Sequence, residues 1–370
     1  MARGARRSMA RLLAKPQWAM LVGAVLGLAG CSAENAGPGI GYVTGVSGPE
    51  DLVAIPGTRW IITSGLREPD HPGALYLVDR ERKVASRLFP GAADRPGLNA
   101  SAWPDCPGPP DPRRFSAHGL SLHWGTSRRD RLYVMNHGER EAIEIFAVAT
   151  LASGPVLSWE GCVPTPPGAL GNGVTALPDG TIAATLMNAP EFFTGPAGAD
   201  HPENWIPKLS SGQTTGYAAT WRKGEGWKKI PGTEGSGPNG IEAARDGSAV
   251  WVALWGNRRL VRAPLVAGGE RLVVETPFMP DNLRWGDDGR LWVAGAASAP
   301  ADYFKCWATK GCRNDYAIAH IDPVTLTLTI VPHPETRPTF GEATAVLRVG
   351  REVWIGANPS DRVAWLRLKD

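Results

Sequence analysis

The chain has 370 residues, with 39 lysines and arginines against 36 aspartates and glutamates, a formal net charge of +3. Five of the basic residues fall in residues 1–30, which contain no acid, so the rest of the chain has 34 basic against 36 acidic residues, a net charge near −2. This balance leaves no basic stripe and argues against a nucleic-acid-binding protein.

The first 30 residues have the pattern of a bacterial export signal. A basic segment is followed by an apolar run over residues 18–29, which is too short to cross a bilayer core of about 30 Å as a helix. The run ends in Leu28-Ala29-Gly30-Cys31, which resembles a lipobox, in which the cysteine thiol receives a diacylglycerol. An ordinary signal peptide and an uncleaved anchor are the alternatives.

We therefore expect residues 1–30 to be a lipoprotein signal peptide and residues 31–39 to be the lipidated Cys31 with a tether. Ser32 does not match an aspartate-type inner-membrane retention signal, so in a Gram-negative cell we expect anchoring to the outer membrane, facing the periplasm. Arg6-Arg7 leave the choice between the general and the twin-arginine export route open.

Four further cysteines agree with export into an oxidising compartment. Cys306 and Cys312 bracket a short polar loop and are the expected disulfide pair, and Cys106 with Cys162 would then link two loops. Free thiols are the alternative. The sequence has no Cys-x-x-Cys or His-x-x-x-His spacing that would support a zinc site.

The region after residue 40 predicts an all-β fold. It contains many glycines and prolines, and a turn followed by a short apolar run occurs six times, about 40 to 75 residues apart. The copies are residues 56–62, 131–135, 179–184, 246–252, 288–293 and 350–355. This spacing suits four short strands per copy and predicts one domain, residues 40–370, folded as a six-bladed β-propeller with four-stranded antiparallel blades around a central channel.

A polar residue precedes each turn. Asn172, Asn239 and Asp281 each lie seven residues before the aspartate of their turn, and Glu342 lies seven before Val349, the corresponding position. Glu50 is one residue short of this offset. In the remaining copy His118 precedes its apolar run at a longer offset.

Because the innermost strands of all blades begin at the same end of the channel, we expect these six polar residues to converge on the axis. Oxygens gathered at this density require a cation, and carboxylate and amide oxygens without thiolates favour calcium. Asn282, beside Asp281, is a further candidate ligand.

At these residues the sequence resembles the serum paraoxonase family and, more distantly, the gluconolactonases. The resemblance runs through nearly all of the chain after residue 45 and rests on the order and spacing of several short motifs. They are Gly48-Pro49-Glu50-Asp51-Leu52, Ile61-Ile62-Thr63-Ser64-Gly65-Leu66, Ala117-His118-Gly119-Leu120, Val134-Met135-Asn136-His137, Pro238-Asn239-Gly240-Ile241 and Asp281-Asn282-Leu283.

The resemblance implies a catalytic calcium ion and a histidine pair near it. The implied ligands are Glu50, Asn172, Asn239, Asp281 and Asn282. The implied histidine pair is His118 and His137, which gluconolactonases lack, so these residues favour the paraoxonase type.

The chain departs from the family at two points. The acid that binds a second, structural calcium ion directly after the third-blade asparagine is replaced by Gly173, which leaves only Asp51 and the Leu120 carbonyl as candidates for a weak second site. The family also joins its two termini by a disulfide, but this chain has no cysteine near its C-terminus. We expect strand pairing to close the ring instead.

The leading hypothesis is a calcium-dependent hydrolase of lactones or aryl esters. The ion would polarise the substrate carbonyl, His118 would act as general base on a water molecule, and His137 would tune His118 or relay its proton. The sequence contains no Gly-x-Ser-x-Gly or His-Glu-x-x-His motif, so serine-hydrolase and zinc-protease mechanisms lack support.

Two alternatives stay open: a non-catalytic, calcium-stabilised propeller that acts as a binding platform, and a sugar-lactone hydrolase of the gluconolactonase type. We expect a monomer that acts on a small molecule. An insertion at residues 192–227, with Phe193, Trp205 and Trp221, would form either a lid over the site or packing at the propeller edge.

Lipidation predicts how the protein partitions in detergent. Cys31→Ala removes the acceptor thiol, so the variant should move from the detergent phase to the aqueous phase of a cloud-point separation and lose fatty-acid label. Equal partitioning of the two proteins, with no label in the native one, would remove the lipoprotein assignment.

Overall fold

The structure, a computed structural model, describes residues 39–68, 71–91, 97–124, 130–196, 198, 201–307, 309, 312–336 and 339–368. All of these belong to one compact unit, Ala33–Asp370. The predicted signal peptide and Cys31 lie outside the described residues.

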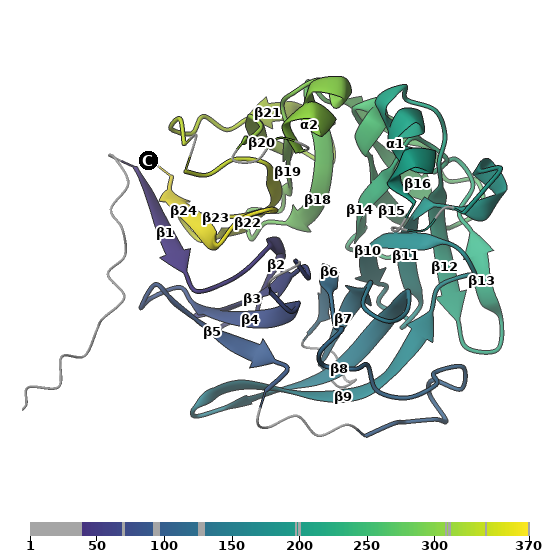
Figure 1. Ribbon diagram of the computed structural model, residues 1–370, viewed down its shortest axis with the longest axis horizontal. Coiled ribbons are helices and arrows are strands. Elements are labelled where there is room, and N and C mark those ends of the chain that lie inside the picture. Colours follow the sequence, from purple (N-terminus) through teal and green to yellow (C-terminus); the bar gives the residue numbers. More distant parts are fainter. Residues whose placement is uncertain are drawn as a thin grey trace, which may run out of the picture. The chain divides into compact units, whose positions relative to one another are not determined.

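Within the described residues, the strands form six four-stranded antiparallel sheets arranged as a six-bladed β-propeller, which confirms the predicted fold (Figure 1). Blade 1 is β2 (Pro49–Ala54), β3 (Trp60–Gly65), β4 (Ala74–Asp79) and β5 (Val84–Phe89). Blade 2 is β6 (Ala117–His123), β7 (Arg131–Asn136), β8 (Ala142–Leu151) and β9 (Gly154–Pro164). Blade 3 is β10 (Leu170–Ala176), β11 (Ile182–Asn188), β12 (Tyr217–Arg222) and β13 (Gly226–Lys229).

Blade 4 is β14 (Pro238–Ala243), β15 (Ala249–Leu254), β16 (Arg259–Pro264) and β17 (Leu272–Glu275). Blade 5 is β18 (Met279–Trp285), β19 (Leu291–Ala296), β20 (Tyr316–Ile321) and β21 (Leu328–Ile330). Blade 6 is β22 (Ala343–Val349), β23 (Glu352–Ala357), β24 (Arg362–Arg367) and the N-terminal strand β1 (Ile40–Thr44). Two helices, α1 (Pro202–Ser210) and α2 (Pro300–Trp307), and two short 3₁₀ turns, η1 (Pro190–Phe192) and η2 (Trp255–Asn257), lie between the strands.

The blades are held together by apolar residues of their second strands. Trp251, Trp292 and Trp354 occupy equivalent places in β15, β19 and β23, and each is at most 2% exposed. Trp251 shares a buried cluster with Leu283 of the next blade, and Trp354 shares one with Leu52. The repeated tryptophan therefore belongs to the core between blades, where burial of a large ring gives most stability.

The ring is closed by the N-terminal strand, as expected. Strand β1 pairs antiparallel with β24, from Ile40 opposite Leu366 to Thr44 opposite Arg362. The last blade is thus built from both ends of the described chain, and its hydrogen bonds close the ring where the resemblance implied a disulfide.

Both predicted disulfides are present, Cys106–Cys162 and Cys306–Cys312. Their settings differ from the expected loops, because Cys162 lies within β9 and Cys306 lies in α2. The second bond therefore fastens the end of α2 to the segment that leads into β20.

The expected insertion at residues 192–227 is only partly an insertion. Trp221 lies in β12, and its ring packs 5.8 Å from that of Trp103, so this half of the segment belongs to blade 3. The other half forms α1, which carries Trp205. Among the described residues, no helix has the length and apolar character needed to span a membrane.

Ring closure through β1 makes a prediction about stability. Tyr42 of β1 is 3% exposed and packs against Phe340, so Tyr42→Ala should lower the free energy of unfolding by about 3–5 kcal/mol. The matched control is Ile330→Ala in the outer strand β21, where the side chain is exposed and a change within about 0.5 kcal/mol is expected. Equal denaturant midpoints for the two variants would show that β1 does not stabilise the ring.

Candidate metal centre and active site

In blades 1 to 5 the innermost strand carries a β-bulge at the residue predicted to face the axis. The pairing register breaks between Pro49 and Leu52, Ala117 and Leu120, Gly171 and Val174, Pro238 and Ile241, and Pro280 and Leu283. A bulge leaves residues unpaired and turns their side chains away from the regular alternation. The unpaired residues include Glu50, His118, Asn172, Asn239 and Asp281.

The structure brings these five side chains together. They line one cavity of about 210 Å³ at the end of the channel where the inner strands begin, and we call its polar part the axial ring, defined by Glu50, His118, Asn172, Asn239 and Asp281. The sixth blade contributes Thr344, whose hydroxyl donates to the Glu50 carbonyl at 2.6 Å.

The prediction that Glu342 completes the ring is wrong. Glu342 is buried outside this cavity, where its carboxylate accepts a hydrogen bond from the Asn314 side chain at 2.7 Å. The β22–β23 hairpin pairs Val349 directly with Glu352 across a two-residue turn, whereas β18–β19 pairs Trp285 with Leu291 across residues 286–290. Val349 is thus a paired strand residue, whereas Asp288 lies in the turn, so counting seven residues back from Val349 passes the bulge at Thr344 by two.

The axial ring presents buried oxygens that have no hydrogen-bond donor. These are Glu50 Oε2, Asn172 Oδ1, Asn239 Oδ1 and Asp281 Oδ1. Burial, reinforced by the charges of Glu50 and Asp51, raises the pKa of Asp281 well above its usual range. Four unpartnered oxygens on residues that line one small cavity suit a hard cation, because a cation removes both the desolvation penalty and the mutual repulsion.

Within the described part of the chain, no group of three or more His, Cys, Asp and Glu side chains has an arrangement that would hold a metal ion. The axial ring does not conflict with this, since half of its unpartnered oxygens belong to asparagine amides. Asn282 lies beside the ring and is buried, and its amide donates to Glu50 Oε1 at 2.8 Å. It thus orients Glu50.

The side chains of His118 and His137 are hydrogen-bonded to each other. A third residue, which the sequence analysis missed, is hydrogen-bonded to His137. His118 Nδ1 lies 2.6 Å from His137 Nε2, and His137 Nδ1 lies 2.9 Å from both carboxylate oxygens of Glu141. Glu141 also accepts from the Gly171 amide of the next blade at 3.2 Å. We call these three residues the Glu–His–His chain.

The electrostatic setting of His118 favours its protonated form. Burial disfavours a charged ring, but the carboxylate of Glu50, whose Oε1 lies 3.4 Å from His118 Nε2, outweighs burial together with Asp51 and Glu141. The net effect raises the pKa of His118. The loop that carries His137 is held by Asn136, whose side-chain oxygen accepts from the Ser116 and Gly138 amides at 3.0 Å.

The cavity walls above the ring are aromatic and apolar. Trp205 and Leu209 of α1 and Tyr303 and Phe304 of α2 line it, together with Trp255. The two helices touch through the Trp205 and Phe304 rings, whose centroids lie 6.4 Å apart, and they neighbour each other in Figure 1. The first half of the predicted insertion therefore forms part of the wall of this cavity.

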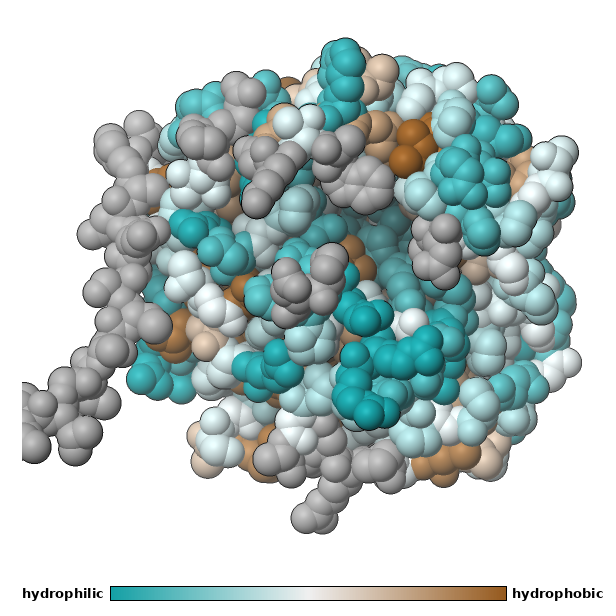
Figure 2. Space-filling model, viewed as in Figure 1, coloured by the Kyte–Doolittle hydropathy of each residue, from teal (hydrophilic) through white to brown (hydrophobic). Residues whose placement is uncertain are grey.

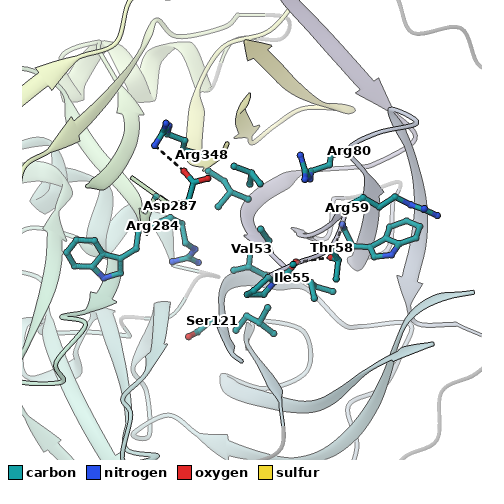
Figure 3. A pocket seen from close by; sticks show the side chains of 18 of the residues that line it. Val53, Ile55, Thr58, Arg59, Arg80, Ser121, Arg284, Asp287 and Arg348 are labelled. Carbon is teal, nitrogen blue, oxygen red and sulfur yellow. Dashed lines mark hydrogen bonds and ion pairs between the residues drawn. The ribbon is translucent and has the colours of Figure 1, made fainter. Parts of the chain in front are cut away.

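A second cavity, of about 1,080 Å³, lies at the other end of the inner strands (Figure 3). Val53, Ser121 and Arg284 line it, and Arg348 forms an ion pair with Asp287 at 3.1 Å. Seen down its shortest axis, the molecule shows mostly hydrophilic side chains around a hollow near the middle (Figure 2).

The candidates for a weak second metal site, Asp51 and the Leu120 carbonyl, both contact the guanidinium of Arg284. Each of these two candidate ligands therefore already has a charged donor. Burial raises the pKa of Asp51 to about 6, against the opposing effect of Arg284.

No protein-family model and no curated protein sequence matches the chain. Its propeller fold is similar to that of two solved structures. A gluconolactonase from Xanthomonas campestris, described as important in glucose secondary metabolic pathways, is 16% identical with a TM-score of 0.51, and the match covers 90% of each chain. A luciferin-regenerating enzyme is 14% identical with a TM-score of 0.52, covering 87% of this chain and 91% of that one. At these identities the likeness shows the fold alone.

Proposed function

We propose that this protein is a calcium-dependent hydrolase of lactones or aryl esters, anchored to the cell envelope through Cys31. The observation that carries the proposal is the axial ring, which joins four unpartnered oxygens to a histidine linked in turn to a second histidine and a carboxylate. The fold shared with a gluconolactonase is consistent with a lactone substrate, but fold alone does not assign activity.

The proposed ligands are the oxygens that lack partners. The ion would be held by Glu50, Asn172, Asn239 and Asp281. Asn282 would orient Glu50 through its hydrogen bond to Oε1. A bound calcium ion would polarise the substrate carbonyl and stabilise the negative charge that develops on its oxygen.

The Glu–His–His chain fixes where the proton-accepting nitrogen lies. Glu141 requires a proton on His137 Nδ1, so in a neutral ring His137 Nε2 becomes an acceptor. It then accepts from His118 Nδ1, which leaves His118 Nε2 on the side of Glu50 and the cavity. A cation held by Glu50 would neutralise the charge that raises the pKa of His118, so the neutral ring would carry a free lone pair at Nε2. His118 is thus arranged as a general base, and His137 and Glu141 as its positioning residues.

The cavity walls favour a substrate with an apolar part. A sugar lactone carries a hydroxyl on most of its carbons, and each needs a polar partner when buried. The wall facing the ring offers Trp205, Leu209, Trp255 and Phe304 instead. We therefore place the sugar-lactone alternative second to a compact lactone or ester with an alkyl or aryl group. The non-catalytic platform is the other alternative, and the variants below distinguish it.

Loss of a charged ligand should abolish both metal binding and hydrolysis. Asp281→Ala should weaken calcium affinity by at least about 100-fold, and Asn239→Ala should weaken it less, since it removes a neutral oxygen. Calorimetric titration gives the affinity, and a panel of lactones and aryl esters, with and without chelator, gives the activity.

The matched control is Asp246→Ala, which removes an exposed acid from the β14–β15 turn and should leave both properties unchanged. Chelator-insensitive hydrolysis at the wild-type rate by the Asp281 variant would refute the calcium-hydrolase proposal. Calcium binding in the wild type without hydrolysis of any substrate in the panel would favour the binding platform.

The Glu–His–His chain should affect turnover without affecting metal binding. His118→Gln should keep the calcium affinity and melting temperature close to wild type and lower kcat by about 10²–10⁴-fold, the usual contribution of a general base. Glu141→Gln removes the charge that holds His137 and should lower kcat by about 10–100-fold with KM unchanged.

Glu139→Gln serves as the control, because Glu139 is a neighbouring acid whose carboxylate contacts the Asp111 amide and Arg140 rather than a histidine. If Glu139→Gln and Glu141→Gln had the same kcat, Glu141 would have no part in orienting the histidines.

A further inference from the structure

One layer below the axial ring, a single arginine side chain crosses the channel. Arg284 lies on β18 of blade 5, and its side chain is 8% exposed. Its guanidinium contacts the Asp51 carboxylate of blade 1 and the Leu120 carbonyl of blade 2. It also donates to the Leu52 carbonyl at 3.1 Å and to Glu242 of blade 4 at 3.2 Å.

This layer, which we call the arginine layer and define by Asp51, Leu120, Glu242 and Arg284, differs from the axial ring in hydrogen bonding. Asp51 Oδ1 accepts from the Leu52 amide at 2.7 Å, and Asp51 Oδ2 accepts from the Leu120 amide at 2.7 Å and from Arg284. In the part of the chain that the structure describes, no side-chain oxygen of this layer is a buried atom without a partner, whereas the ring above has four.

The geometry explains why a guanidinium suits this place. Arginine keeps its charge when buried and has five donors in a planar fork, so one side chain can bind two carboxylates and several carbonyls at once. A metal ion beside Asp51 would have to displace it and would leave a buried, unpaired cation.

We propose that Arg284 is a built-in cation that takes the place of a second metal ion, so that no metal ion binds beside Asp51. The resemblance to paraoxonases implies a structural ion at this level, and the residues present do not fit one. Because Asp51 directly follows Glu50, the arginine layer also holds the β2 bulge from which Glu50 reaches the ring. The inference does not depend on the protein being a hydrolase.

The first test uses the wild-type protein. Crystals soaked in terbium chloride should show anomalous density in the axial ring and none within ligand distance of Asp51 and the Leu120 carbonyl. Density beside Asp51 would overturn the proposal. Density at neither place would count against the proposed calcium site but would agree with the arginine layer, so the two proposals can fail separately.

The second test removes the guanidinium from the arginine layer. In calcium-free buffer Arg284→Ala should lower the melting temperature by roughly 5–10 °C, because Asp51 loses its only contact to a buried cation. Millimolar calcium should restore part of that loss, and elemental analysis should find one more calcium ion per chain than in the wild type.

Two variants control this experiment. Arg284→Lys keeps the charge, so it should lose less stability and take up no additional ion. Arg245→Ala removes an arginine of the same lower cavity whose guanidinium instead contacts the Gly286 carbonyl and the Trp285 ring. If Arg284→Ala bound no additional ion and had the same melting temperature as Arg245→Ala, the proposal would be wrong. If it did not fold, the terbium experiment would still decide.

Discussion

The need to neutralise oxygens gathered on the propeller axis governs the rest of this structure. The inner strands all begin at the same end, so residues near their starts meet at one small cavity. Glu50, Asp51 and Asp281 are all at most 8% exposed there. Burial of that much negative charge is unfavourable without a cation. The chain supplies one cation itself, Arg284, and leaves the unpartnered oxygens of the axial ring facing a cavity.

The two layers share a backbone, which links stability to the site. Glu50 and Asp51 are consecutive residues in one β-bulge, so they point into different layers. The arginine layer can hold β2 in place, while the axial ring would bind the proposed ion and substrate. The Glu–His–His chain is also held by another blade, because Glu141 accepts a hydrogen bond from the Gly171 amide of blade 3. Glu50 and Glu141 are therefore each held by a residue of another blade.

Where prediction from the sequence succeeded, a regular repeat carried the information. The turns fixed the number of blades, and the constant offset found Asn172, Asn239 and Asp281, which line one cavity. Where the repeat was irregular, the prediction failed: the tight β22–β23 turn leaves Val349 paired in the strand, so Thr344 and not Glu342 lines the cavity. Glu141 and Arg284 have no counterpart in the repeat, and their roles depend on contacts with other blades.

The sequence by itself determined a six-bladed propeller, closure by strand pairing, and the five polar residues of the axial ring. It could do so because strand alternation and turn spacing are local and occur six times. The tertiary structure alone decided that Glu141 orients His137, that α1 and α2 wall the cavity, and that a guanidinium binds Asp51. These outcomes depend on which side chains meet across the axis, where Arg284 and Asp51 are separated by 233 residues along the chain. A local sequence pattern cannot show that two residues so far apart in the chain are in contact.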